Sequence, residues 1–314
     1  MIHKDHPKIP HGRKGILVVN LGTPSGTSWK EIRHFLKEFL SEPRIVDINP
    51  ILWWLILNFY ILIFRPRKIS KAYKRIWTKD GSPLRTTTKR QAELLDKELD
   101  MPGIDVEWAL RFGGPSIADG IKSLKDKGCE QITVLPLFPQ YSSSTTATVS
   151  DEVFRVLMKE RWQPQVQIIP RYFDDDDYIK AIVGSLEREI ERLEWTPDTI
   201  LLSYHNVPKI TLDKGDPYYC QCIKTTRLIR EQMKPYNIPI ETVFQSRLGR
   251  KKDWFDPALD ETLKKLPAEG PHKILVVCPG FSADCLETID EIGNEGQKIF
   301  RNAGGTEFKL VHCL

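Results

Sequence analysis

The sequence predicts an α/β protein made of two similar halves, each built on a parallel β-sheet. Short apolar segments alternate with longer amphipathic ones along most of the 314 residues, a pattern typical of parallel strands joined by helical crossovers. A weak internal repeat supports two halves. Residues 14–24 (KGILVVNLGTP) are similar to 198–208 (DTILLSYHNVP), and residues 131–138 are similar to 273–281.

The apolar segments rich in Val, Ile and Leu predict the strands 16–20, 105–110, 132–137, 167–170, 199–204, 240–244 and 274–278. Helical periodicity predicts helices over 29–40, 89–99, 117–127, 149–161, 178–193, 222–233 and 286–300. Open α/β sheets bind ligands at the carboxyl ends of their strands. We therefore expect the functional residues in the loops that follow these strands.

Composition excludes several classes of protein. The net charge of +4 is small, and basic residues gather only at 65–68 and 247–252, so no nucleic-acid partner is indicated. No GxGxxG motif follows the first strand and no Walker A sequence occurs, so the sequence only weakly indicates nucleotide binding. Residues 1–13 form a polar leader without the apolar core of a signal peptide, which predicts a cytoplasmic protein.

The six cysteines are Cys129, Cys220, Cys222, Cys278, Cys285 and Cys313. No two of them have the CxxC spacing of a zinc or redox site, and a disulfide framework does not fit a protein without a secretory signal. Reduced thiols are therefore expected, with no tightly bound cofactor. An iron–sulfur cluster that uses Cys220, Cys222 or Cys313 is the weaker alternative.

Residues 51–64 (ILWWLILNFYILIF) are almost entirely apolar. The segment is shorter than the roughly 20 residues that a helix needs to cross a bilayer. Two interpretations remain open, a buried core helix and an apolar lip that lines a ligand cleft and touches a membrane surface. The tryptophans Trp53 and Trp54 and the basic residues that follow favour the lip slightly.

A row of carboxylates, Asp284, Glu287, Glu291 and Glu295, follows the apolar segment 274–280. Steps of three and four residues predict that these acids share one face of a helix. His205 stands at the end of another predicted strand. An imidazole and a row of carboxylates at strand ends indicate a site that handles metal ions and protons.

Two polar segments have simpler interpretations beside the functional ones. The loop 141–148 (YSSSTTAT) offers hydroxyl and amide donors, either to cap the next helix or to bind carboxylates or phosphates. The acids 174–177 are expected to cap the helix that begins near Tyr178, because acidic side chains favour helix N-termini.

Ordered motifs over about 15–313 resemble the ferrochelatases, the enzymes that insert ferrous iron into a porphyrin in the last step of haem biosynthesis. The motifs are VNLGTP (19–24), KEFLS (37–41), AYKRIW (72–77), GSPL (81–84), LPLFPQYSSSTT (135–146), SYH (203–205), GDPY (215–218), FQSRLG (244–249) with Trp254, and FSADCLETIDE (281–291).

The resemblance implies two Rossmann-like domains, 14–172 and 173–314, around a deep cleft with 51–64 as its lip. The second domain carries His205 and the acidic helix. In the family's pattern His205 and Glu287 are the catalytic pair and contact the iron, and Asp284, Glu291 and Glu295 form an acidic row that leads away. The porphyrin-binding positions implied are Tyr141, Ser142, Arg171, Trp254 and Phe281.

This chemistry explains the residue types. Metal insertion removes two pyrrole protons and strips water from the metal, so the site needs bases and metal ligands. Imidazole and carboxylate side chains provide both. Whether His205 or Glu287 contacts iron first stays open. Iron is expected as a substrate and protoporphyrin IX as the partner, with peripheral contact to the inner face of a membrane through 51–64 and an undetermined oligomeric state.

Three departures from the family's pattern stand out. Asn206 replaces the usual glycine after the active-site histidine, and asparagine is the residue that best tolerates a positive φ after glycine. Leu21 stands where enzymes that act on coproporphyrin carry tyrosine, which favours protoporphyrin. The family continues past Cys313 into a C-terminal helix, which we expect this sequence to lack.

Two alternatives to a protoporphyrin ferrochelatase follow from the same motifs. One is a chelatase of the same fold that acts on another metal or tetrapyrrole. The other is a non-catalytic porphyrin- or haem-binding protein, disabled by Asn206 or by the missing helix.

Overall fold

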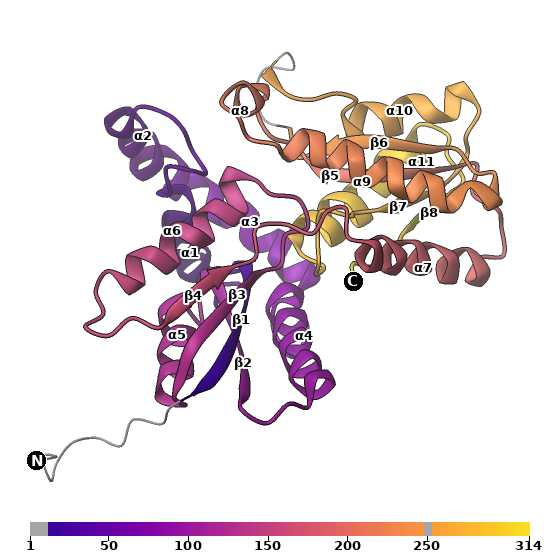
Figure 1. Ribbon diagram of the computed structural model, residues 1–314. Coiled ribbons are helices and arrows are strands. Elements are labelled where there is room, and N and C mark those ends of the chain that lie inside the picture. Colours follow the sequence, from indigo (N-terminus) through magenta and orange to yellow (C-terminus); the bar gives the residue numbers. More distant parts are fainter. Residues whose placement is uncertain (1–11, 248–252) are drawn as a thin grey trace, which may run out of the picture. The chain divides into compact units, whose positions relative to one another are not determined.

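The structure is a computed structural model that describes residues 12–247 and 253–314 (Figure 1). Most of the predicted leader (1–11) and of the basic segment 247–252 therefore lie outside the described residues. The chain forms two compact units. The first contains the chain up to Ser70 with Asp80–Leu137 and Ser144–Pro170, and the second contains Lys71–Lys79, Phe138–Ser143 and Arg171–Leu314.

The first unit is built on a parallel sheet of four strands in the order β2-β1-β3-β4. The strands are β1 (Arg13–Gly22), β2 (Ile104–Phe112), β3 (Cys129–Pro136) and β4 (Gln165–Ile168). Helix α5 (Ile117–Asp126) covers one face, where Gly120 lies so close to Leu17 that a Cβ would sit 2.5 Å from it. Helix α4 (Pro83–Leu99) covers the other face, where Thr88 Oγ1 accepts a hydrogen bond from Asn20.

The first unit contains several further helices. They are α1 (Trp29–Leu40), α2 (Pro50–Ile56), the π-helix η1 (Leu57–Ile61), α3 (Leu62–Ile76), the π-helix η2 (Ser143–Ala147) and α6 (Thr148–Leu157). Two of them, α3 and η2, run across the boundary into the second unit. Helix α1 begins at the residue that its sequence predicts, because Ser28 and Glu31 form a reciprocal capping box.

The second unit repeats the same topology, with a parallel sheet in the order β6-β5-β7-β8. Its strands are β5 (Thr199–His205), β6 (Ile240–Gln245), β7 (Lys273–Val277) and β8 (Glu307–Leu310). Its helices are α7 (Asp176–Arg192), α8 (Lys209–Asp213), α9 (Tyr218–Met233), the 3₁₀ turn η3 (Lys234–Tyr236), α10 (Leu259–Glu269), the π-helix η5 (Glu287–Gly296) and α11 (Gln297–Asn302).

Both faces of this second sheet are buried. Alternate residues of β5 face a core that is shared with α7 and α9, which includes Leu202 and Ile182. The residues between them face a second core with α10 and α11, which includes Leu201 and Phe300. Because this parallel sheet is covered on both sides, its inner strands β5 and β7 carry consecutive apolar residues instead of alternating ones.

The predicted α/β class with two parallel sheets is confirmed, and the internal repeat corresponds to strands in matching positions. Segments 14–24 and 198–208 contain β1 and β5, while 131–138 and 273–281 contain β3 and β7. Strand β8 and helices α3, α8 and α10 were not predicted. The four residues of β8 contain Glu307 and Lys309 in alternation, and α10 carries Pro267 within it. Strand β8 therefore lacks a clear sequence signal, whereas α10 has one in Leu259, Leu263 and Leu266 at helical spacing, which the prediction missed.

Candidate active site

His205 is the last residue of β5 and the only exposed one in this strand. Its Nδ1 lies 2.7 Å from the carbonyl oxygen of Asn206. A carbonyl oxygen only accepts hydrogen bonds, so in the neutral imidazole Nδ1 carries the hydrogen and Nε2 has a free lone pair. The local backbone therefore leaves the outer ring nitrogen available as a base or a metal ligand.

Asn206 is held by its side chain and not by an unusual backbone. It is buried and does not have a positive φ, so the expectation that asparagine replaces glycine there as a left-handed residue is wrong. Instead, Nδ2 donates to the Phe255 carbonyl at 2.9 Å, and Oδ1 accepts from the Phe255 amide at 3.1 Å. The amide thus ties the end of β5 to the segment that carries Trp254.

The acidic row lies on a π-helix and not on the α-helix that its spacing predicted. Helix η5 is π-helical over ten residues, from Glu287 to Gly296. In a π-helix each turn takes up more residues than in an α-helix, so residues four apart no longer lie directly above one another. The acids therefore sit in different environments, and π-helical segments occur frequently at functional sites.

Asp284 precedes η5 and already has several partners. One carboxylate oxygen lies 2.7 Å from His312 Nδ1, and the other accepts hydrogen bonds from Thr288 Oγ1 at 3.0 Å and from the Cys313 amide at 3.4 Å. Asp284 thus fastens the C-terminal segment to the start of the acidic helix. His312 has no distinctive sequence context, and reasoning from sequence missed it.

The three glutamates of η5 differ in their surroundings. Glu287 is half-buried at its start. Glu291 Oε2 accepts a hydrogen bond of 2.5 Å from Ser246 Oγ. Desolvation of its carboxylate and the nearby charge of Glu287 raise the pKa of Glu291 to about 7, although part of the side chain stays exposed. Glu295 is exposed and pairs with Lys298 at 3.0 Å.

A further acid of η5, Asp290, was not predicted. It is buried, and its two oxygens accept hydrogen bonds from Arg75 of α3 at 2.7 and 2.6 Å. Burial raises the pKa of Asp290, but the hydrogen bonds from Arg75 and Asn294 outweigh this and keep the pKa below its ordinary value. Asp290 was not among the predicted acidic row, because in the α-helix assumed there Asp290 lies on another face.

All five residues that the resemblance implied for porphyrin binding belong to the second unit. Tyr141 and Phe281 are half-buried, and Phe281 packs on the core beneath the sheet. Trp254 forms an isolated backbone bridge with Pro208, three residues after His205. Arg171 is exposed, with its guanidinium 5.6 Å from the Phe173 ring centre. Ser142 is buried.

The donors of the hydroxyl-rich loop 141–148 are directed partly at an internal carboxylate. Asp216 Oδ2 accepts hydrogen bonds from the Ser143 amide at 2.6 Å and from Ser142 Oγ at 3.3 Å. The Tyr141 amide donates to Gln221 at 2.7 Å. These donors thus bind carboxylate and amide oxygens of the protein itself. The predicted cap of α7 is confirmed, because Asp175 accepts from the amides of Asp177 and Tyr178.

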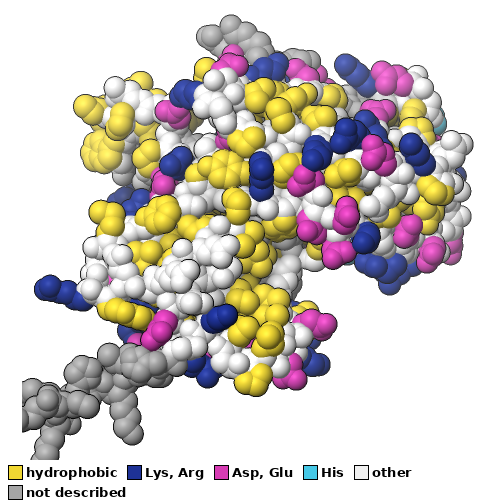
Figure 2. Space-filling view, viewed as in Figure 1, with side chains coloured by type: hydrophobic (Ala, Val, Ile, Leu, Met, Phe, Trp, Pro, Cys, Tyr) yellow, Lys and Arg dark blue, Asp and Glu magenta, His cyan; other side chains and the backbone are white. Residues whose placement is uncertain are grey.

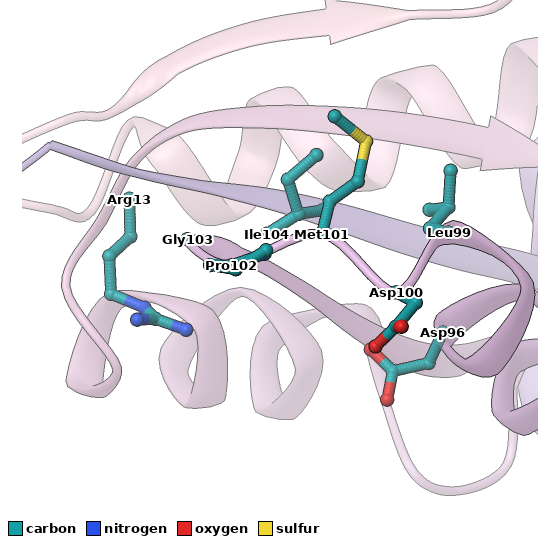
Figure 3. Close-up of a pocket in the computed structure, with 8 residues that line it drawn as sticks. All are labelled: Arg13, Asp96, Leu99, Asp100, Met101, Pro102, Gly103 and Ile104. Atoms are coloured by element: carbon teal, nitrogen blue, oxygen red, sulfur yellow. The ribbon is translucent and has the colours of Figure 1, made fainter.

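The described residues contain no cluster of three or more His, Cys, Asp or Glu side chains arranged to hold a metal ion. A cavity of about 370 Å³ lies beside η5 and is lined by Ser246, Arg247, Asp260 and Glu291, among others. A second cavity, of about 390 Å³, lies at the amino ends of β1 and β2 between Arg13 and Ile104 (Figure 3). This second cavity contains none of the predicted site residues.

The apolar segment 51–64 forms α2, η1 and the start of α3, and most of it is exposed. Trp54, Phe59, Tyr60 and Phe64 are each at least 57% exposed, whereas Leu57 is buried. Figure 2 shows hydrophobic side chains gathered over α2. The interpretation as a buried core helix is therefore wrong. No helix in the described part of the chain has the length and apolarity to cross a membrane.

Comparisons with known proteins agree on one family. A family profile described as "Ferrochelatase" matches residues 13–314. The chain is 45% identical over 313 residues to a ferrochelatase of Allorhizobium ampelinum, covering 99% of this chain and 91% of that protein. It is 44% identical to a ferrochelatase of Rhizobium meliloti, with 99% and 92% covered.

A solved structure shows a similar fold. SirB from Bacillus subtilis with Fe³⁺ superposes with a TM-score of 0.54 at 13% sequence identity, covering 96% of this chain and 88% of that one. At this identity the likeness shows the shared fold alone.

Proposed function

This chain belongs to the ferrochelatase family, whose reaction is the insertion of ferrous iron into protoporphyrin IX, and we propose that His205 and Glu287 carry out that reaction here. The observation that supports this most is the geometry of His205. Its inner ring nitrogen is bound to the Asn206 carbonyl, and its outer nitrogen has a free lone pair at an exposed strand end.

Insertion requires two pyrrole protons to leave as the metal enters. His205 Nε2 accepts one of them or ligates the incoming iron, and Glu287 takes the complementary role, since imidazole and carboxylate groups suit both tasks. Glu291, with a pKa of about 7, accepts a proton from Glu287 at neutral pH. The exposed Glu295 then passes it to water.

The porphyrin lies against the aromatic side chains Tyr141, Trp254 and Phe281, with Arg171 facing a propionate as a cation. Aromatic rings offer large flat apolar surfaces that suit a macrocycle. Ser142 shapes this wall through its contact with Asp216. We assign Asp284 an anchoring role, because its carboxylate is already bound to His312 and Thr288.

The exposed apolar segment 51–64 brings the protein to the inner face of a membrane as a peripheral contact, from the cytoplasmic side. Exposed tryptophan, tyrosine and phenylalanine next to Arg65, Arg67 and Lys68 match the interfacial pattern of such surfaces. A membrane contact of this kind places the enzyme where an apolar porphyrin dissolves.

Anaerobic incubation of the purified chain with Fe²⁺ and protoporphyrin IX tests the proposal. Loss of porphyrin fluorescence together with haem absorbance is the expected result, and His205→Ala is expected to bind porphyrin without forming haem. A parallel reaction with Co²⁺ and one with a more carboxylated porphyrin test the specificity. Faster turnover of either would assign the protein to another metal or tetrapyrrole, and porphyrin binding without insertion would make it a binding protein.

A further inference from the structure

Ser246 has a strained backbone next to the acidic helix. Its φ is +63°, in the left-handed region that side chains other than those of Gly, Asn and Asp seldom adopt. The other non-glycine residues with positive φ in the described chain are Asp100 and Asn237. Both of these terminate helices, α4 and η3, where a left-handed residue is common. Ser246 instead follows directly after β6, and strain of this kind clusters at functional sites.

The strand before Ser246 is firmly fixed. Gln245, the last residue of β6, aligns with His205 on the neighbouring strand β5. It is buried, and its side-chain oxygen accepts a hydrogen bond of 2.6 Å from Ser203 Oγ. The backbone of Gln245 also accepts the Asn206 amide at 2.9 Å. Ser246 therefore starts from a rigid point beside the catalytic histidine.

The left-handed turn brings the Ser246 hydroxyl to Glu291. The Ser246 hydroxyl donates to the carboxylate, and the distance of 2.5 Å from Oγ to Oε2 is at the short end for an O–H···O hydrogen bond. Glu291 lies one helical turn beyond Glu287, and the charge of Glu287 acts on it. The contact thus links the end of β6 to the second acid of the row.

Several charged groups surround Glu291. Glu287 and Asp290 act on it from its own helix. Arg247, which follows β6, and Asp260 of α10 line the same cavity, where Arg247 is held by Glu261 at 2.7 Å. The floor of the cavity is apolar, with Leu263 and Ile292 among its residues. A donor to Glu291 in such a place has a large effect on its charged state, because the negative neighbours oppose ionisation.

We infer that Ser246 is a positioning residue for proton transfer, whose hydroxyl favours the ionised form of the Glu291 carboxylate and orients it to accept protons released at Glu287. The inference rests on the proposed function. A proton that Glu287 takes from a pyrrole nitrogen passes to Glu291 and ends on water, so no other reactant is needed. The backbone strain at Ser246 is the cost of this contact.

Ser246→Gly tests the inference, because it removes the hydroxyl and relieves the strain at once. The loss of a donor to the carboxylate raises the pKa of Glu291, so a higher pH is needed to ionise it. We expect kcat at pH 7 to fall several-fold and the acid limb of the kcat–pH profile to move up by about 0.5–1 pH unit. The Tm is expected to stay or rise, and the KM for porphyrin to stay unchanged.

Asn237→Gly is the matched control, because it relieves a left-handed residue that precedes β6, at the opposite end of this strand from Ser246. It is expected to leave the pH profile unchanged. Ser246→Asn keeps a side-chain donor and tolerates a positive φ, so it is expected to restore part of the profile. In Glu291→Gln, adding Ser246→Gly is expected to cause no further loss of kcat.

A second measurement separates this inference from the proposed function. A ¹³C NMR titration of the glutamate carboxyls, with Glu291 assigned by its loss in Glu291→Gln, reports the contact without turnover. A Glu291 pKa that does not rise in Ser246→Gly overturns the inference, as does a lower Tm with an unchanged pH profile. A Glu291 pKa that rises in Ser246→Gly supports the contact. Absence of metal insertion by the wild-type chain at every pH would overturn the proposed function instead.

Discussion

The two units share one strand order but use the ends of their strands differently. In the internal repeat, Leu21 and Gly22 at the end of β1 stand where His205 and Asn206 stand at the end of β5. Gly22 has a φ of +138°, and a Cβ there would lie 2.1 Å from the Phe112 carbonyl oxygen. Asn206 has no positive φ and is held by its own side chain.

This difference shows how one topology serves two purposes. At β1 the backbone packs so tightly on the neighbouring strand that no side chain fits after Leu21. At β5 a side-chain amide makes the same turn rigid and leaves an imidazole exposed. The third strand of each unit shows a similar contrast, since the chain after β3 enters the hydroxyl-rich η2 and the chain after β7 leads to the acidic η5.

The largest expected effect is the loss of His205. His205→Ala removes the free imidazole nitrogen, and metal insertion is expected to fall by about 10²–10⁴-fold, with porphyrin affinity nearly unchanged. Glu287→Gln is expected to lower turnover more than Glu291→Gln, because Glu287 is nearer the reaction. His34→Ala, which alters an exposed histidine of α1 in the first unit, is the control. Turnover like that of the wild type in His205→Ala would remove the chemical contrast between the units.

The matched turns give the next largest effect. Gly22→Ala forces a Cβ into the Phe112 carbonyl and is expected to lower the free energy of unfolding by about 3 kcal/mol. Asn206→Gly removes two hydrogen bonds to Phe255 and is expected to cost about 1–2 kcal/mol. Chemical denaturation measures both. A larger loss for Asn206→Gly would mean that the β5 turn also depends on tight backbone packing.

Arg75→Ala tests the buried acid of η5. It leaves Asp290 without its main partner and is expected to lower the free energy of unfolding by about 1–3 kcal/mol, while Lys74→Ala, which changes an exposed neighbour, is expected to have almost no effect. The folded pKa of Asp290 is depressed, so its contribution is complete above about pH 4 and is lost as the pH falls through the folded value.

The pH dependence supplies the check on this third prediction. The stability difference between wild type and Arg75→Ala is expected to shrink when unfolding is measured below pH 4. A difference that stays constant down to pH 2 would show that Arg75 acts through packing and not through the carboxylate.

The smallest expected effect concerns the apolar segment of the first unit. Replacement of Trp54, Phe59 and Tyr60 by serine is expected to weaken binding to anionic liposomes about tenfold, since it removes three large exposed aromatic side chains from this surface. The Tm is expected to change little, because these side chains are exposed. Leu57→Ser, at the buried position of the same segment, is expected to lower the Tm and serves as the contrast. Unchanged liposome binding by the triple variant would refute the membrane role.

Sequence patterns determined much of the architecture, for local physical reasons. Apolar strands such as 199–204 and capped helices such as 29–40 are specified by neighbouring residues, so their class and order were predictable. The repeat between 14–24 and 198–208 predicted two similar sheets. His205 and Glu287 were chosen from strand ends and from resemblance. The structure places His205 at the carboxyl end of β5 and Glu287 at the start of η5, in the chain that follows β7. Their catalytic roles are the proposal made above.

Tertiary structure alone decided how these groups are set. The i, i+4 spacing of Glu287, Glu291 and Glu295 is equally compatible with an α-helix. The π-helix that is observed occurs together with the contacts of Asp290 and Ser246, which the spacing does not reveal. The partners of Asp284 and Asn206, His312 and Phe255, are distant in sequence and carry no local signal. Sequence by itself determined which residues are present at the strand ends, and the carbonyl of the adjacent Asn206 sets the tautomer of His205. Long-range hydrogen bonds decided the charge and orientation of the acids, because those depend on neighbours that only folding brings together.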